Sequence, residues 1–435
     1  LPRLASYLFD DSGQSPGAPQ DRAHPSGGSG WLSDFTEAAL ADGARLVEDF
    51  LARFPPYDET RGTGVSPQAA DALREYATSG LAERLRRARE EWVSRRDELR
   101  QRIEAIDAAG AQLVPGDPGH RQLGRELRAE RAAVARAARD LGLSSAHTAL
   151  VDLGLLPNYS LVDSVTELEA TLTWTEEKES GKEQDGKKEK EHHSEVLRYE
   201  RSARYALEDL APGNRFYIQG YKHHITGVDI GRPGRRTWRW WRICPECGYV
   251  RTHRAEHDPD PCPRCRSAAI GDVGCLHRVL IPRRVYARAR RDDARLRDDT
   301  DERERRHYTT VPAVDIPQDA LVRAWRHKSA TFGWEFTRQA VIRHINVGAA
   351  RVDVPADTPF AGQSVRLNPF WVCESCGYAD ADGGPAASPE KPGSDRLDRY
   401  HRPWCPRLRE GVPESRARQT GTKILLAHEL RTEAV

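Results

Sequence analysis

Paired cysteine turns constrain this chain more than any other feature of its sequence. CPECG places Cys244 and Cys247 in one turn, and after 14 intervening residues CPRC places Cys262 and Cys265 in a second. Two such turns bring four thiolates to one ion with tetrahedral geometry. The proline in each turn and the glycine after the first turn favour tight loops that aim backbone N–H groups at sulfur. The spacing predicts a zinc ribbon over residues 240–268. Free thiols or disulfides are the alternatives, and a reducing compartment disfavours disulfides.

A second group of ligands is split between two distant segments. CESCG supplies Cys373 and Cys376, and HRPWC supplies His401 and Cys405. The polar segment between them can be long, because a metal ion ties its ends together. These four residues predict a second zinc lobe over 370–408. With four protein ligands each, both zinc ions are expected to be structural, because neither site keeps a position open for water.

The sequence offers no catalytic motif. It contains no GxxxxGK[ST] loop, and TGTK at 420–423 lacks the spacing that wraps a phosphate. The GxSxG string GQSPG at 13–17 lies in a Pro/Gly/Ser-rich stretch and lacks the strand-to-helix turn of a nucleophile elbow, and no HExxH helix is present. Cys275 is left over from the two zinc groups and is expected to be a buried, small apolar side chain. We therefore predict no catalytic residue in this chain.

Length and composition allow two or three domains but not a uniformly packed interior. Of the 435 residues 31% are charged and 38% hydrophobic, so parts of the chain are expected to be solvated helix or insertion. The net charge of +1, from 67 Lys and Arg against 66 Asp and Glu, gives no argument for nucleic acid. There is no apolar run long enough for a membrane and no secretory signal, which predicts a cytoplasmic protein. The absence of methionine indicates a fragment of a longer protein.

The chain is predicted to be an α+β protein, with helices in its first third. Residues 1–60 combine a Pro/Gly/Ser linker at 11–30 with a helical segment that Pro55 and Pro56 stop. Residues 61–150 are predicted to form an antiparallel helical hairpin, because apolar residues recur at helical spacing over 81–106 and again over 123–141. Its many arginines fit a solvated face, with DNA binding as the alternative.

Residues 151–435 are predicted to form a β-rich zinc-binding domain. SVTELEATLTW alternates polar and apolar residues, and FYIQGYKHHITGVDI is rich in aromatic and β-branched residues. The tract at 176–193 is almost entirely charged and polar, which predicts a disordered insertion.

One basic, aromatic segment is a candidate nucleic-acid surface. RRTWRWWRI precedes the first cysteine turn and alternates arginines, for phosphates, with tryptophans, for stacked bases. The alternative is a strand whose tryptophans pack under the zinc lobe while its arginines face water. The candidate contacts are Arg235, Arg236, Trp238, Arg239, Trp241 and Arg242.

Several short phrases, in this order, resemble one protein family. They are GLLPNYSLVDSVTEL, LEDLAPGNRFYIQGYKHHITGVDI, CPECGYV, VIRHINVG, CESCGY with HRPWC, and ILLAHELRTEAV. Together they resemble the C-terminal zinc-binding region of large bacterial superfamily-two DEAD/DEAH-box helicases. Related regions occur in Mrf-type DNA-repair helicases and in the helicase-associated subunit of DISARM phage defence. The likeness spans about residues 150–435.

This resemblance implies an accessory region of an ATP-dependent DNA helicase, active in DNA repair or phage defence. ATP and magnesium would then belong to motor domains that this chain lacks, either earlier in the same protein or in a separate helicase subunit. DNA, as a single strand or a duplex junction, is the expected nucleic-acid partner, and no membrane partner is expected. The alternative is a non-catalytic adaptor that binds a separate helicase through its zinc lobes and helical hairpin.

Overall fold

The computed structural model places most of the chain in two compact units. It describes residues 4–9, 31–58, 63–114, 118–153, 155–156, 164–177, 190–232, 235–296, 306–316, 321–329, 332–349, 357–381, 401–402, 404–406 and 421–433. The predicted linker at 11–30 lies outside these residues. The helical unit contains 1–103 and 134–160, and the β-rich unit contains 104–133 and 161–435. The boundary between the units crosses both helices of the predicted hairpin, so each unit contains part of it.

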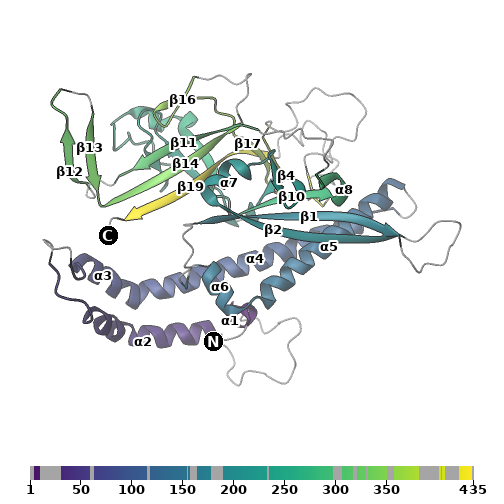
Figure 1. Cartoon of the computed structure of the whole chain (residues 1–435), viewed down its shortest axis with the longest axis horizontal. Coiled ribbons are helices and arrows are strands. Elements are labelled where there is room, and N and C mark those ends of the chain that lie inside the picture. The colour runs from purple at the N-terminus through teal and green to yellow at the C-terminus, as the bar shows by residue number, and fades with distance from the viewer. Residues whose placement is uncertain are drawn as a thin grey trace. The chain divides into compact units, whose positions relative to one another are not determined.

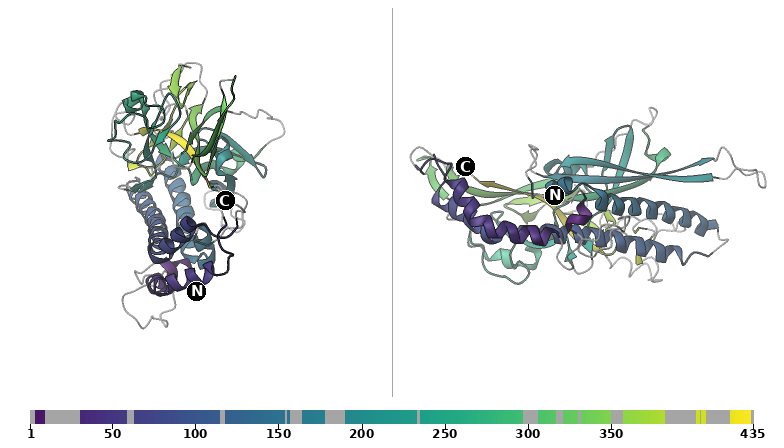
Figure 2. Two further views of the ribbon diagram at one scale, coloured as in Figure 1. Left: turned by 90° about the vertical axis from the view of Figure 1, so that its left-hand side faces the viewer. Right: turned by 90° about the horizontal axis from the view of Figure 1, so that it is seen from below.

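The helices of the first third are α1 Ala5–Phe9, α2 Trp31–Leu51, α3 Pro67–Glu75, the π-helical turn η1 Tyr76–Gly80, α4 Leu81–Gly110, α5 Pro118–Leu143 and α6 Ala146–Asp152. Long antiparallel α4 and α5 run side by side (Figure 2). The helical unit packs around Phe9 and Trp92, whose ring centroids lie 5.8 Å apart. The hydroxyl of Ser145 accepts the N–H of Thr148 and so caps the start of α6. No described helix is long and apolar enough to cross a membrane.

The β-rich unit, together with these helices, makes the fold mixed α+β, as predicted (Figure 1). Its described helices are α7 Ala203–Asp209, α8 Arg291–Ala294 and the 3₁₀ turns η2 Ala268–Gly271 and η3 Val273–Cys275. Its described strands are β1 Val165–Glu177, β2 Lys190–Ser202, β3 Arg215–Ile218, β4 Tyr221–Val228, β5 Gly231–Arg232, β6 Arg235–Arg236, β7 Arg239–Ile243, β8 Val250–Arg251, β9 Leu276–Leu280, β10 Arg284–Arg290, β11 Tyr308–Asp315, β12 Leu321–Arg326, β13 Gly333–Thr337, β14 Gln339–Ala349, β15 Thr358–Phe360, β16 Gln363–Val365, β17 Phe370–Cys373, β18 Ala379–Asp380 and β19 Gly421–Glu433.

The charged tract at 176–193 is partly strand. β1 and β2 stay paired as far as Glu177 and Lys190, so the prediction of a disordered segment is wrong at both ends of the tract. Near its base the ring of Trp174 stacks on that of His193, with centroids 5.5 Å apart. Residues 178–189 of the tract lie outside the described residues. The paired backbone and this ring contact extend the strands into a sequence whose composition alone argues against structure.

Two main sheets form the β-rich unit. One has the order β2-β1-β10-β4-β3, and the other runs β11-β14-β19-β9-β7-β8, with β17 and β18 branching from β19. Most neighbouring strands are antiparallel, whereas β1 with β10 and β19 with β9 are parallel. Strands far apart in the sequence therefore meet in each sheet, and β19 brings the end of the chain into the middle of the larger one.

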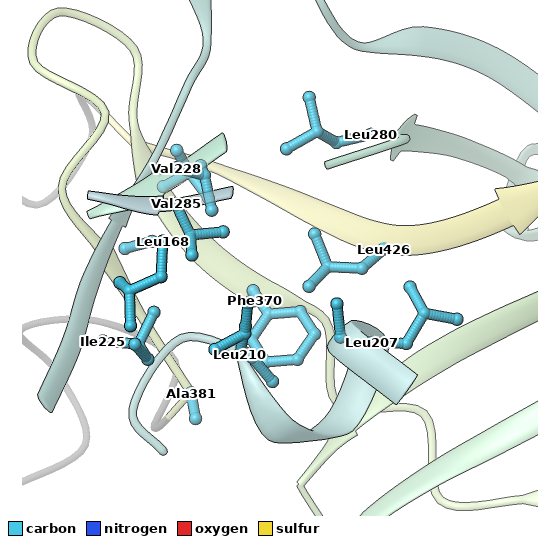
Figure 3. Close-up of a cluster of buried hydrophobic side chains, with 14 of the residues drawn as sticks. Leu168, Leu207, Leu210, Ile225, Val228, Leu280, Val285, Phe370, Ala381 and Leu426 are labelled. Atoms are coloured by element: carbon cyan, nitrogen blue, oxygen red, sulfur yellow. The ribbon is translucent and has the colours of Figure 1, made fainter. Parts of the chain in front are cut away.

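The core of the unit lies on both faces of β19. Leu426 packs with Leu168, Leu207 and Phe370 in a cluster that joins both sheets and α7 (Figure 3). Its neighbour Leu425 points to the opposite face and packs with Trp241 and other apolar residues there. A strand buried on both faces needs consecutive apolar residues, which explains the uninterrupted run ILLA at 424–427.

Candidate metal centres

The first cysteine group converges at the end of β7. Cys244 and Cys247 lie in the turn between β7 and β8, and Cys262 and Cys265 lie in the turn before η2. Cys244 Sγ is 3.6 Å from Cys265 Sγ, and Cys247 Sγ is 3.6 Å from Cys262 Sγ. All four sulfur atoms lie within 4.8 Å of one another. The two turns that the spacing predicted to meet do meet.

The second group assembles beside β17 from two segments that are distant in the sequence. Cys373 Sγ is 3.9 Å from Cys405 Sγ, which is itself 3.5 Å from Nδ1 of His401. Cys376 completes the group and accepts the backbone N–H of Arg402 at 3.4 Å. Most of the predicted loop between the halves, 382–400, lies outside the described residues.

Three of the cysteine turns share one backbone geometry. In each, the backbone N–H of the first cysteine donates to the carbonyl oxygen of the residue five positions later. The carbonyl oxygen of the same cysteine accepts the N–H of the residue four positions later, and these distances are 2.8–3.2 Å. That fourth residue has positive φ in every case: 76° at Gly248, 65° at Arg266 and 70° at Gly377. The repeated geometry turns both cysteine side chains of a pair toward the same point, which is what a shared ion requires.

The spacing of these atoms fits a tetrahedral ion. In a zinc site the sulfur ligands lie about 2.3 Å from the ion and the nitrogen ligands about 2.0–2.1 Å from it. Tetrahedral geometry then places two sulfurs about 3.8 Å apart, and a sulfur and a nitrogen about 3.6 Å apart. The separations of 3.6–3.9 Å between sulfurs and 3.5 Å between sulfur and nitrogen in the structure match these values. The eight residues therefore form two groups that could each hold one metal ion.

The electrostatics of the thiols also favour a cation. In the first group burial raises the pKa of Cys244 and raises that of Cys247 to about 11. In the second group burial raises the pKa of Cys376, whereas the hydrogen bond with Cys376 lowers that of Cys373. The more exposed Cys265 differs, because the backbone N–H of Ser267 lowers the pKa of that thiol. The neighbouring thiols of one group cannot all ionise by themselves, whereas a divalent cation stabilises all the thiolates of the group at once.

Four protein ligands in each group limit the chemistry. A zinc ion that activates water has three protein ligands and one open position, whereas a structural zinc ion has four. The first group sits at the end of β7 and the second at the end of β17. Metal ions there would fasten turns and loops to the larger sheet.

The predicted nucleic-acid residues do not form one exposed surface. Trp241 is 2% exposed and packs in the core, and Arg242 is 6% exposed. Neither can receive a base or a phosphate, so these two predicted contacts are wrong. Arg239 is exposed, whereas Arg236 and Trp238 are half-buried, with the guanidinium 5.2 Å from the indole centroid.

The side chain of the remaining candidate, Arg235, lies outside the described part of the chain, although its backbone pairs with that of Arg232.

Sequence reasoning missed the structural role of Arg242. Its guanidinium donates to the carbonyl oxygens of Ala255, Ile270, Gly271 and Asp272 at 2.6–3.2 Å. Three of these acceptors lie after the CPRC turn and one lies before it. The arginine thus holds together the loops that carry Cys262 and Cys265. Basic residues beside a cysteine turn are commonly solvent-facing, so the local pattern gave no sign of this.

Sequence reasoning also missed a polar network beside the second group. Trp404 donates its indole N–H to Glu130 Oε1 at 2.9 Å, and the other carboxylate oxygen of Glu130 pairs with Arg288. Glu130 belongs to α5 and is only 3% exposed. The network ties the residue next to Cys405 to a helix 274 residues earlier in the chain.

Comparisons with protein-family models, with curated protein sequences and with solved structures found no match for this chain.

Alanine at the two glycines of the cysteine turns should have unequal effects. At Gly377 (φ 70°) a Cβ would lie 2.4 Å from the carbonyl oxygen of Val228, whose N–H bonds the Gly377 carbonyl. At Gly248 (φ 76°) the nearest atom would be 3.3 Å away. Both changes carry the cost of a left-handed alanine, about 1–2 kcal/mol, and Gly377→Ala adds a backbone clash. We expect Gly377→Ala to release metal to a chelator faster than Gly248→Ala, and equal release rates would contradict this.

Proposed function

We propose that this chain is the zinc-stabilised accessory region of an ATP-dependent DNA helicase. It would bind nucleic acid and guide a strand as it leaves the motor, in DNA repair or phage defence. The motor, with its ATP and magnesium, would lie in other domains or in a separate subunit, in the cytoplasm. This function is the one that the sequence resemblance implies, and the closed metal groups are compatible with it.

The assembly of all eight predicted ligands into two closed groups supports this proposal best. We infer that both groups bind zinc, because three thiolates with an imidazole, or four thiolates, at tetrahedral spacing select zinc over harder cations such as magnesium. Both groups adjoin the larger sheet. Such an arrangement supports a rigid platform rather than a reaction centre, which agrees with the lack of a catalytic motif in the sequence.

Zinc content and nucleic-acid binding of the purified chain test the proposal together. We expect two zinc ions per chain by elemental mass spectrometry. We also expect binding to fluorescent single-stranded DNA that weakens at least about tenfold between about 50 mM and about 200 mM salt, because phosphate contacts release counterions. The chain alone should not hydrolyse ATP. Two zinc ions without binding to DNA or RNA would overturn the nucleic-acid role.

An adaptor that binds a separate helicase is the second candidate function, and one observation favours it. Phe35, Leu46, Phe50 and Phe54 are exposed on or just after α2. Leu46 and Phe50 stand four residues apart on one face of α2. The ring of Phe54, just after the helix, lies 5.0 Å from that of Phe50. Exposed apolar residues grouped in this way are typical of protein-binding surfaces. Zinc-loaded chain that binds a helicase motor but no nucleic acid would support this candidate.

A further inference from the structure

Among the described residues of the β-rich unit, a hairpin distant in sequence from the metal ligands carries a cluster of exposed aromatic side chains. β12 and β13 are inserted between β11 and β14, which pair with each other in the larger sheet. Within the described chain, β12 and β13 pair only with each other. Figure 1 shows them standing apart from the remaining strands, beyond the end of β14.

Register places three aromatic side chains on one face of this hairpin. Trp325 lies directly opposite Trp334, and Phe336 lies opposite Arg323, two residues along on the same face. At the tip, Phe332 meets Trp334 edge to face with centroids 5.4 Å apart and stacks on His327 at 5.7 Å.

Four aromatic residues of the hairpin are exposed, although Phe332 contacts Trp334 and Trp325 lies opposite Trp334. The exposed fractions are 51% for Trp325, 55% for Phe332, 60% for Trp334 and 54% for Phe336. Apolar rings that pack a core would be shielded from water, so this cluster does not serve the interior of the unit. A contiguous exposed patch of this kind marks a binding surface.

The backbone holds the ring-bearing strands close together. At Gly333, opposite Arg326, a Cβ would lie only 2.3 Å from the carbonyl oxygen of Trp325. The strand next to Trp334 thus approaches its partner where only glycine fits. The two indoles are presented on a paired ladder, and not on a loop.

Charge identifies the kind of partner. Residues 321–338 contain the cations Arg323, Arg326, Lys328 and Arg338 against the single carboxylate of Glu335. Arg323 shares the aromatic face, and Arg326 and Lys328 are exposed near the tip. Rings that can stack on unpaired bases, with cations spaced beside them for phosphates, are the two components of a surface that binds single strands without sequence preference. A protein-binding apolar patch has no need of this excess of cations.

We propose that the β12–β13 hairpin is a binding site for single-stranded nucleic acid, in which Trp325, Trp334 and Phe336 stack on bases and Arg323 contacts the backbone. This inference rests on the proposed function, and it replaces the RRTWRWWRI segment as the principal contact surface. Stacking on aromatic faces tolerates any base, so little sequence preference is expected.

The test compares hairpin variants with a matched aromatic control in the full chain. We expect Trp325→Ala and Trp334→Ala each to weaken binding of an oligonucleotide of about 20 thymidines by roughly 5- to 100-fold, measured by fluorescence anisotropy. Trp334→Phe should retain most of the affinity, because phenylalanine keeps a stacking face. Tyr205→Ala removes an aromatic ring that is 64% exposed on α7, outside the hairpin, and should bind as the unchanged chain does. Unaltered zinc content of each variant checks its folding.

Charge reversal gives a separate measurement. Arg323→Glu should lower the salt dependence of binding as well as the affinity, because one phosphate contact is lost. If the unchanged chain binds DNA and the Trp325→Ala and Trp334→Ala variants bind it equally well, the hairpin is not the binding site, and the proposed function still stands. No binding by the unchanged chain would overturn both. If these variants bind DNA fully but no longer bind a helicase motor, the hairpin is a protein interface, and the inference is also overturned.

Discussion

A chain carrying Cys373→Ser is expected to bind one zinc ion where the unchanged chain binds two. Serine is not ionised near neutral pH and is a poor zinc ligand, so the second group would keep only Cys376, His401 and Cys405. Binding of a structural zinc ion supplies about 10–16 kcal/mol of folding free energy in small zinc domains. Its loss should therefore loosen the turn after β17 and the segment at 401–405, while the first group stays metallated. Elemental mass spectrometry counts the ions, and limited proteolysis locates the loosened region.

Two further variants make this result specific. His401→Ala should lose the same single ion, because Nδ1 of His401 lies 3.5 Å from Cys405 Sγ in the same group. Cys275→Ser is the matched control: it makes the same atomic change at a thiol that belongs to neither group and that bonds the carbonyl oxygen of Ala269 at 3.2 Å. It should keep both ions. Two zinc ions retained in Cys373→Ser would show that the second group does not bind metal.

The ligand groups could be predicted from sequence because their geometry is local. A CxxC turn aims two sulfur atoms at one point whatever surrounds it, and the structure shows the same backbone bonds at Cys244, Cys262 and Cys373. Only the pairing of CESCG with HRPWC required a long-range inference. That inference worked because three cysteines without a fourth ligand would leave a structural site incomplete. The helical and β-rich character of the two parts followed in the same way from residue periodicity.

The surface residues could not be predicted, because burial depends on distant contacts. Trp241, Arg242 and the exposed Arg239 belong to the same Arg/Trp segment, and nothing local distinguishes them. Trp241 and Arg242 are buried because residues of other strands and of the loops around the first metal group cover them. Conversely, Trp325 and Trp334 have strand-forming sequences, and their exposure follows from the absence of a covering element among the described residues. Pattern alone cannot distinguish a strand that is covered from one that is not.

Replacing Glu130 by alanine should destabilise the β-rich unit strongly. The carboxylate accepts the indole N–H of Trp404 and pairs with Arg288, and it is almost fully buried. Removing it leaves a largely buried guanidinium without its counter-charge, at a cost of about 3–5 kcal/mol. We expect a lower midpoint in urea unfolding followed by tryptophan fluorescence. Release of zinc from the second group should also be faster, because Trp404 adjoins the ligand Cys405.

The control for Glu130→Ala lies one residue along the same helix. Arg131 pairs with Asp107 at 2.6 Å, but both side chains are about half exposed. Water solvates either partner when the other is removed, so Arg131→Ala should cost at most about 1 kcal/mol and leave zinc release unchanged. Glu130→Gln keeps an acceptor for Trp404 but loses the charge that Arg288 requires. Its urea midpoint should therefore lie between those of Glu130→Ala and Arg131→Ala. Equal effects of Glu130→Ala and Arg131→Ala would mean that water reaches Arg288, and the carboxylate would then not anchor the second metal group to α5.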